Sequence, residues 1–324
     1  MWDIFKANIY CYLCNPMCLV ASSSTRVALS HMETSYRHRL LLILLGVVCT
    51  SLTLANTPIK EPNWSMKTKI APAYFGPNAF QVPEMLDGRT SQELRIGLSA
   101  DHYAGMLTTF GGDVTSSFSA KVVIPLFSSR VNIAFWMPVV EYYRTNAEVN
   151  EIRRLPYTYD LEGWDSGDLY VSTDIQLFTQ QLHGADIAIR AALKTASGNT
   201  YALARYYDAP GYFFDAAIGR DLVSSDRTVL RLAASSGFLC WQTDVGRQND
   251  AVMYGAQASL KQGALTLKAE FGGYVGWERD GDCPMVISTM LSYAFNHLFL
   301  HAQYKEGLAD WPFRQFSLGV TYCY

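Results

Sequence analysis

The chain has 324 residues, of which 49% are hydrophobic and 17% charged, and its formal net charge is −3. This balance excludes a strongly basic surface, so nothing in the composition supports binding to nucleic acid or to an anionic membrane surface. The 20 Tyr, 16 Phe and 7 Trp residues suit the aromatic girdles of a membrane protein, and also the core of a soluble sandwich.

Residues 1–31 are predicted to be a mis-annotated or disordered extension. Met32 is a better start, because it leads directly into an export signal. The extension contains Cys11, Cys14 and Cys18, whereas a structural zinc site needs about four ligands, often in two pairs. We therefore leave this stretch out of the fold prediction.

A secretory signal peptide is predicted at residues 32–55. Two arginines precede an apolar run that begins at Leu40, and small residues at Thr53 and Ala55 form a cleavage site after it. The alternative is a membrane anchor helix. The 16 residues from Leu40 to Ala55 are fewer than the roughly 20 that span a bilayer, which favours the signal peptide.

Residues 56–91 are rich in Pro, Asn and Gly. This composition predicts an irregular lead-in that lies on the periplasmic side or folds into the mouth of the domain that follows. Three cysteines remain after the signal, Cys240, Cys283 and Cys323. They are too few for a disulfide framework, but a bridge between Cys240 and Cys283 stays open.

Residues 92–324 are predicted to form one β domain of about twelve strands. Apolar and polar residues alternate with the period of two that gives a strand one apolar and one wet face. In one segment, for example, Val171 and Ile175 fall on one face of the expected strand and Asp174 falls on the other. The expected strands cover about 93–101, 116–127, 131–143, 168–179, 186–196, 211–220, 228–240, 251–261, 264–275, 285–295, 297–306 and 313–324.

The links between these strands alternate in length. Links after odd strands are long, at about 102–115, 144–167, 197–210, 241–250, 276–284 and 307–312, and several after even strands are very short. Outer-membrane barrels have short periplasmic turns and longer external loops, whereas a soluble sandwich has no reason to alternate in this way. The predicted fold is therefore all-β, a closed antiparallel up-and-down transmembrane β-barrel of about 12 strands.

The last strand supports this prediction most directly. Alternate residues from Phe316 to Tyr324 are apolar or aromatic, and those between them are small or polar. A strand of about 9–11 residues with an apolar outer face and aromatics at the interfaces is the unit of a transmembrane barrel. The ending also resembles the C-terminal signature of bacterial outer-membrane proteins. We expect outer-membrane lipid around the barrel, and recognition of this strand by the barrel assembly machinery.

Two segments resemble a known family. Gly167–Phe178 is similar to a strand led by Gly-Asp-Leu in the outer-membrane, transporter-like barrels named for the meta-cleavage pathway of phenol degradation, and Ala192–Gly198 is similar to a later strand end in them. Ala196 and Ser197 stand where the family usually has proline and threonine. The resemblance covers about residues 116–240 and implies a barrel that takes up hydrophobic or aromatic compounds.

If the apolar faces meet lipid, the opposite faces line a lumen. An Arg or Lys facing lipid near the midplane would cost about 2–4 kcal/mol, so the charged residues are assigned inward. They are Arg95, Lys121, Asp174, Arg190, Lys194, Asp215, Arg231, Lys268, Glu270 and Lys305. They form either a solute path or a set of cross-strand ion pairs that fill a narrow barrel, such as Asp174 with Arg190 or Lys194.

Four tryptophans, Trp164, Trp241, Trp277 and Trp311, fall in the expected external loops or at their edges. One interpretation is that they capture an aromatic or hydrophobic ligand. The other is that they form a belt at the membrane interface.

Signals for catalysis or a metal are weak. There is no Gly-x-Ser-x-Gly elbow, and His297 and His301 would lie about 13 Å apart along a strand, too far to share a metal. Glu278, Asp280 and Asp282 are expected to form a solvated hairpin tip rather than a calcium loop, which needs more ligands at set positions. We expect neither a cofactor nor a metal.

The predicted function is that of a passive outer-membrane channel or uptake protein for small solutes, with hydrophobic or aromatic compounds as candidates, and not that of an enzyme. Two alternatives stay open. A barrel-type envelope enzyme of the phospholipase kind would need a Ser and a His side by side near the lipid boundary. A structural or adhesive surface protein would act through its external loops.

Overall fold

The computed structural model describes residues 75–127, 129–153, 161–198, 205, 210–244, 247–278 and 281–324. All of them belong to the unit Thr53–Tyr324, the second of the two units into which the chain divides. The predicted extension, the predicted signal peptide and the first part of the lead-in lie outside the described residues. None of the helices in the described part is long and apolar enough to cross a membrane.

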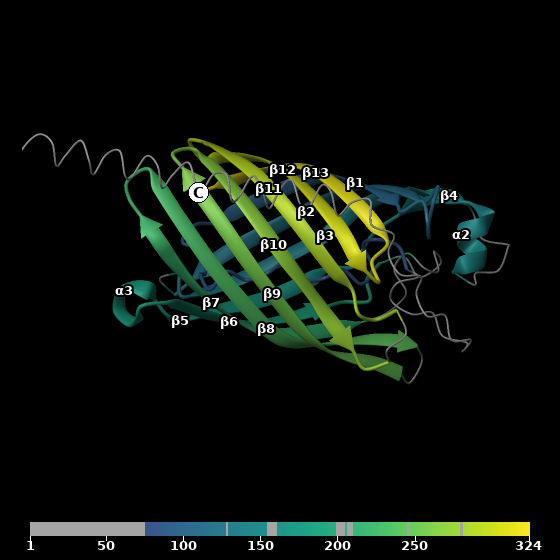
Figure 1. The fold of residues 1–324 in the computed structure, drawn as a ribbon, viewed down its shortest axis with the longest axis horizontal. Coiled ribbons are helices and arrows are strands. Elements are labelled where there is room, and N and C mark those ends of the chain that lie inside the picture. Colours follow the sequence, from purple (N-terminus) through teal and green to yellow (C-terminus); the bar gives the residue numbers. More distant parts are fainter. Residues whose placement is uncertain are drawn as a thin grey trace, which may run out of the picture. The chain divides into compact units, whose positions relative to one another are not determined.

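Twelve antiparallel strands form the wall of a closed barrel (Figure 1). They are β1 (Arg95–Gly105), β2 (Val114–Leu126), β3 (Val131–Arg144), β5 (Tyr170–Phe178), β6 (Asp186–Lys194), β7 (Gly211–Ser224), β8 (Thr228–Asp244), β9 (Arg247–Gln262), β10 (Leu265–Gly276), β11 (Met285–Phe295), β12 (Leu298–Ala309) and β13 (Phe313–Cys323). The sheet closes because β1 pairs with both β2 and β13. The predicted fold class and strand number are confirmed.

Three short elements lie on the links between wall strands. The helix α2 (Ala147–Ile152) begins after Asn146, whose side chain caps it by accepting a hydrogen bond from the backbone N–H of Val149. The strand β4 (Glu162–Asp165) pairs with the end of β3, and the helix α3 (Gln180–His183) follows β5. These elements are too short to show a period in the sequence.

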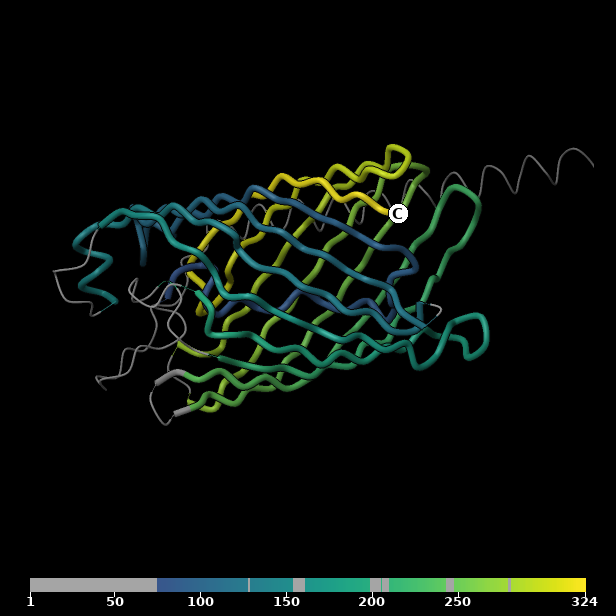
Figure 2. The backbone as a smooth tube through the Cα atoms, turned by 180° about the vertical axis from the view of Figure 1, so that it is seen from behind, coloured from purple at the N-terminus to yellow at the C-terminus, as the bar shows by residue number. Residues whose placement is uncertain are grey.

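The links define two ends of the barrel (Figure 2). The links that follow β2, β5, β7, β9 and β11 share one end with the C-terminus, and we call this the turn end. The other links form the loop end. The expected long link at 241–250 is wrong, because β8 continues to Asp244 and β9 begins at Arg247. Trp241 and Asn249 are cross-strand partners and fully buried, so the ladder extends over residues that were predicted to leave the barrel.

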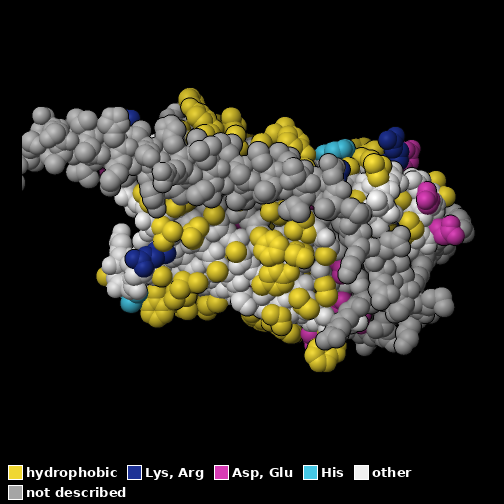
Figure 3. Space-filling view, viewed as in Figure 1, with side chains coloured by type: hydrophobic (Ala, Val, Ile, Leu, Met, Phe, Trp, Pro, Cys, Tyr) yellow, Lys and Arg dark blue, Asp and Glu magenta, His cyan; other side chains and the backbone are white. Residues whose placement is uncertain are grey.

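Exposed apolar side chains surround the wall. Every wall strand contributes at least one large hydrophobic residue that points outward and is more than a third exposed: Leu98, Phe118, Phe135, Ile175, Ile189, Phe214, Leu232, Val252, Phe271, Leu291, Leu300 and Leu318. Figure 3 shows hydrophobic patches over the visible wall, with charged side chains nearer its two ends. An apolar surface this extensive marks a lipid or partner interface, and a continuous belt around a closed barrel fits lipid.

Candidate functional site in the barrel lumen

Residues 75–91 run through the lumen from the loop end to the turn end, and we call this segment the plug. It contains no helix or strand. Near the loop end, Asn78 accepts a hydrogen bond from the Tyr103 hydroxyl at 2.8 Å. Near the turn end, Arg89 contacts Asp221 at 2.8 Å. The described part of the lead-in is therefore folded inside the barrel.

Aromatic packing closes the lumen at the loop end. The rings of Phe75 and Phe80 meet edge to face with 4.8 Å between centroids, and the Phe80 ring lies 5.8 Å from that of Trp241. The Tyr274 hydroxyl donates to the backbone oxygen of Phe80 at 3.2 Å. These side chains belong to one buried cluster, so packed apolar side chains occupy the lumen at this level. We call this part of the lumen the seal.

Polar contacts fix the plug beside the seal. The Asn78 amide donates to the Glu141 carboxylate at 2.6 Å, and the same carboxylate also accepts from the Arg205 guanidinium. Asn78 is 3% exposed, Glu141 1% and Arg205 3%. Buried polar groups of this kind need partners, and here the plug supplies one of them.

At mid-depth, Glu84 of the plug faces three cationic side chains. Its carboxylate lies 2.5 Å from Lys121 Nζ on β2 and 3.8 Å from Lys268 Nζ on β10. Its backbone oxygen accepts a hydrogen bond from Arg190 on β6 at 2.8 Å. In the closed ring of wall strands, β6 lies three strands away from β2, β10 lies four strands away from β6, and β2 lies five strands away from β10. A residue that touches all three must lie near the barrel axis.

The plug does not fill the lumen at this depth. The Glu84 side chain is 57% exposed and that of Lys121 is 44% exposed, although both lie inside the wall. Accessible space therefore adjoins this ion pair, in contrast to the seal above it. A carboxylate and an ammonium in such a space are within reach of a small solute.

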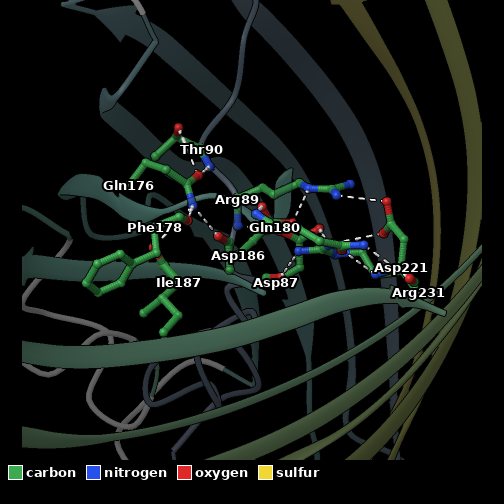
Figure 4. Close-up of polar contacts among 11 residues, drawn as sticks. Asp87, Arg89, Thr90, Gln176, Phe178, Gln180, Asp186, Ile187, Asp221 and Arg231 are labelled. Atoms are coloured by element: carbon green, nitrogen blue, oxygen red, sulfur yellow. Dashed lines mark hydrogen bonds and ion pairs between the residues drawn. The ribbon is translucent and has the colours of Figure 1, made fainter. Parts of the chain in front are cut away.

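A network of ion pairs holds the plug at the turn end (Figure 4). Arg89 of the plug contacts Asp186 at 2.6 Å and Asp221 at 2.8 Å. Arg231 of β8 contacts the same two carboxylates at 2.9 Å each, and also donates to the backbone oxygen of Asp87 at 2.7 Å. Arg231 Nε also lies 3.7 Å from the Asp87 carboxylate, so two guanidinium groups face three carboxylates. We call Arg89, Asp186, Asp221 and Arg231 the latch.

The plug backbone approaches the wall closely at the latch. Gly88 has φ = +86°, and a Cβ there would meet Asp186 O and Gly219 N at 2.9 Å, so only glycine fits without strain. The side chain of Gln176 donates to Gly88 O at 2.8 Å and accepts from the backbone N–H of Thr90 at 2.9 Å. These contacts position Arg89 between its two carboxylates.

The predicted lumen residues lie on the inward side of their strands; Arg95, on the same side of β1 as Asp101 and Tyr103, is exposed at the turn end. The expected pairing of Asp174 differs from the structure. Arg190 is in register with both Asp174 and Asp215, but its two hydrogen bonds to a carboxylate go to Asp215, at 2.8 and 2.9 Å. Lys194 pairs with Asp168 instead.

The remaining predicted lumen residues fall into three groups. Lys268 pairs with Glu270 at 2.8 Å. Lys305 lies 5.8 Å from the centroid of the Trp311 ring. Lys121 and Arg231 contact the plug, as Lys268 also does at 3.8 Å, which the analysis of strand patterns did not anticipate. Whether these residues line a solute path stays a prediction.

The four tryptophans do not form one site. Trp164 on β4 is 70% exposed and Trp277 after β10 is 85% exposed, both at the loop end. The external position expected for Trp241 is wrong, since its side chain is buried in the seal. Trp311 lies in the β12–β13 link, but it turns inward, and its indole N–H donates to the plug at Pro77 O.

Groups suited to other chemistry are sparse in the described part of the chain. It contains no cluster of three or more His, Cys, Asp or Glu residues that could hold a metal ion, and Cys240, Cys283 and Cys323 are free thiols. His102 Nδ1 and Ser116 Oγ lie 3.1 Å apart on the outer face. No carboxylate contacts His102 within the described ranges, so this pair lacks the third group that orients a catalytic base.

No protein family model and no curated protein matches the chain. Among solved structures, it is similar to an outer membrane channel from Pseudomonas putida F1, with a TM-score of 0.51 and 12% identity over 75% of this chain and 100% of that one. It is also similar to the NanC and KdgM porins, with TM-scores of 0.45 and 0.43 and identities of 8% and 9%, over 70% of this chain and 98% and 99% of theirs. The first similarity shows that the chain has the fold of an outer-membrane β-barrel.

Proposed function

We propose that this protein is a passive outer-membrane channel for small solutes, whose lumen is closed by its own plug. The apolar belt supports a position in the bilayer, and the similarity to a channel of the same fold supports transport. By the usual orientation of such barrels, the turn end faces the periplasm and the loop end faces outward. Hydrophobic or aromatic solutes are candidates, as the family resemblance implies.

One observation carries this proposal. The plug crosses the lumen, yet side-chain contacts and isolated backbone contacts hold it, without any strand pairing to the wall. Releasing those contacts leaves the ladders between neighbouring wall strands intact. A segment with few backbone hydrogen bonds opens at a lower free energy than the sheet around it, so the plug can move while the barrel persists.

Liposome swelling with a small sugar tests the proposal. The full chain is reconstituted, and its swelling rate is compared with that of Arg89→Ala, which removes the plug's side of the latch. We expect slow swelling for the unchanged protein and faster swelling for the variant. Lys261→Ala removes an exposed cation at the turn end, outside the latch, and serves as the matched control. An absence of flux in both the unchanged protein and Arg89→Ala would contradict a channel.

A second candidate function, hydrolysis of lipid esters, is favoured by one observation. The pair of His102 and Ser116 lies on the outer face, in a row around the barrel that also contains Phe316 and Tyr142 as cross-strand neighbours. This is the Ser and His arrangement near the lipid boundary that the enzyme alternative requires. The missing orienting group makes the channel the better-supported function.

A further inference from the structure

We infer that Glu84 occupies an anion site in the lumen, built around Lys121, that otherwise binds the carboxylate of a small solute. This inference rests on the proposed channel function, because it concerns which solutes that channel takes. The plug then closes the lumen by presenting a carboxylate where the solute's carboxylate would bind.

The charges around Glu84 show why this place takes an anion. Arg190 already has Asp215 as a bidentate partner, and Lys268 lies nearer to Glu270, at 2.8 Å, than to Glu84, at 3.8 Å. Among the described residues, Glu84 is the one carboxylate paired with Lys121. Withdrawal of Glu84 therefore leaves the Lys121 ammonium group without its ion-pair partner, although the Asp174 carboxylate still interacts with it electrostatically.

The other charged contacts of the plug do not offer such a place. Arg89 shares two carboxylates with Arg231 in the latch, and a solute would have to break several contacts at once to enter there. At the seal, Asn78 is buried with Glu141. Glu84, by contrast, is paired with a single near cation, Lys121, and its side chain is 57% exposed, so a solute can approach the ion pair without breaking a network of contacts.

An aromatic wall lies beside the anion site. Lys121 Nζ is 5.8 Å from the centroid of the Trp136 ring, and Trp136 stacks on Tyr170 with 5.1 Å between centroids and 14° between the ring planes. A flat apolar group attached to the carboxylate can pack against this wall while the carboxylate binds the ammonium. The ligand class is therefore a small monocarboxylate with an apolar body.

Binding of such a solute competes with Glu84. The carboxylate of the solute replaces that of Glu84 on Lys121, and the middle of the plug loses its attachment to β2. A neutral molecule of the same shape gains no such contact. A charge-assisted hydrogen bond is about twice as strong as a neutral one, which supports a preference of about tenfold for the anion.

Calorimetric titration of the full chain in detergent micelles tests this inference with three probes of nearly one shape: benzoate, benzamide and benzamidine. Glu84→Gln removes the internal competitor, so we expect it to bind benzoate about tenfold more tightly than the unchanged protein. Lys121→Gln should lose benzoate binding, and benzamide should respond to neither change. Glu93→Gln, which removes an exposed carboxylate at the turn end, is the matched control.

Two results would overturn the anion site: equal benzoate affinity of Glu84→Gln and the unchanged protein, or benzoate binding that survives Lys121→Gln. Heat-modifiable migration on a gel confirms that each variant is a folded barrel. Liposome uptake by Glu84→Gln then separates the two proposals. Equal uptake of all three probes overturns the anion site and leaves the channel, whereas benzoate binding without any uptake supports the site and contradicts the channel.

Discussion

Gly88 of the plug and Gly219 of β7 approach each other so closely that neither has room for a side chain. A Cβ on Gly88 would lie 2.9 Å from Gly219 N, and a Cβ on Gly219 would lie 2.3 Å from Asp87 O. Plug and wall therefore meet through their backbones at this point. The close approach does not interrupt the wall, since the β7–β8 ladder continues through Gly219.

The first prediction follows from this contact. Gly219→Ala places a methyl group 2.3 Å from Asp87 O of the plug and 2.5 Å from a guanidinium nitrogen of Arg231, so the plug and its latch contacts must shift while the ladder of β7 stays intact. We expect faster liposome swelling than for the unchanged protein, with an unchanged heat-modifiable shift on a gel. Gly272→Ala, on β10, where a Cβ would come no closer than 3.5 Å to any other atom, controls for the loss of a glycine. An unchanged swelling rate for Gly219→Ala would show that the contact between the plug and β7 is not needed to keep the lumen closed.

The second prediction compares the two arginines of the latch. The side chain of Arg231 is 5% exposed and that of Arg89 is 42% exposed. Removing one partner of a buried ion pair costs about 3–5 kcal/mol, whereas an exposed pair contributes about 0–1 kcal/mol after solvent screening. Urea unfolding should therefore show a much larger loss of stability for Arg231→Ala than for Arg89→Ala. Equal losses would mean that the plug arginine holds the wall together as well.

Much of the fold could be predicted from the sequence, because lipid outside and a wet lumen inside force a period of two on every wall strand. The strand that contains Val171, Asp174 and Ile175 shows this constraint on both faces. The plug has no such period. Its position depends on contacts between Glu84 or Arg89 and strands far along the chain, and nothing in the local pattern encodes those partners.

The errors at Trp241 and Asp174 have the same origin. The predicted strand ended at residue 240 and the chain was expected to leave the barrel there, but Trp241 is buried against Phe80 of the plug and remains in the wall. Asp174 was an expected partner of Arg190, and register places it correctly. The choice of Asp215 depends on side-chain geometry, which the order of residues along the strands does not determine.

The third prediction concerns the outer face. Ile189 lies in the middle of β6 and points outward, so Ile189→Arg places a charge in hydrocarbon at a cost of about 2–4 kcal/mol. Unfolding from lipid vesicles should show this loss. Leu182→Arg, in α3 and outside the wall strands, changes an exposed leucine in the same way and should cost little. Similar losses of stability for both variants would mean that the apolar belt of the wall contacts water rather than lipid.

The fourth prediction concerns the alternative activity. Without a group that orients His102, the Ser116 hydroxyl is not activated. The purified protein should therefore release no fatty acid from phospholipid vesicles beyond the level of Ser116→Ala. Measurable release that disappears in Ser116→Ala would favour the enzyme over the channel.

The central claim is that the plug closes the lumen, and single-channel recording in planar bilayers tests it most directly. The full chain is compared with the double variant Glu84→Gln, Arg89→Ala, which removes the mid-depth ion pair and the plug's side of the latch. We predict that the unchanged protein is mostly closed and that the double variant opens often and to a higher conductance. Identical conductance and open time for the two proteins would contradict the claim.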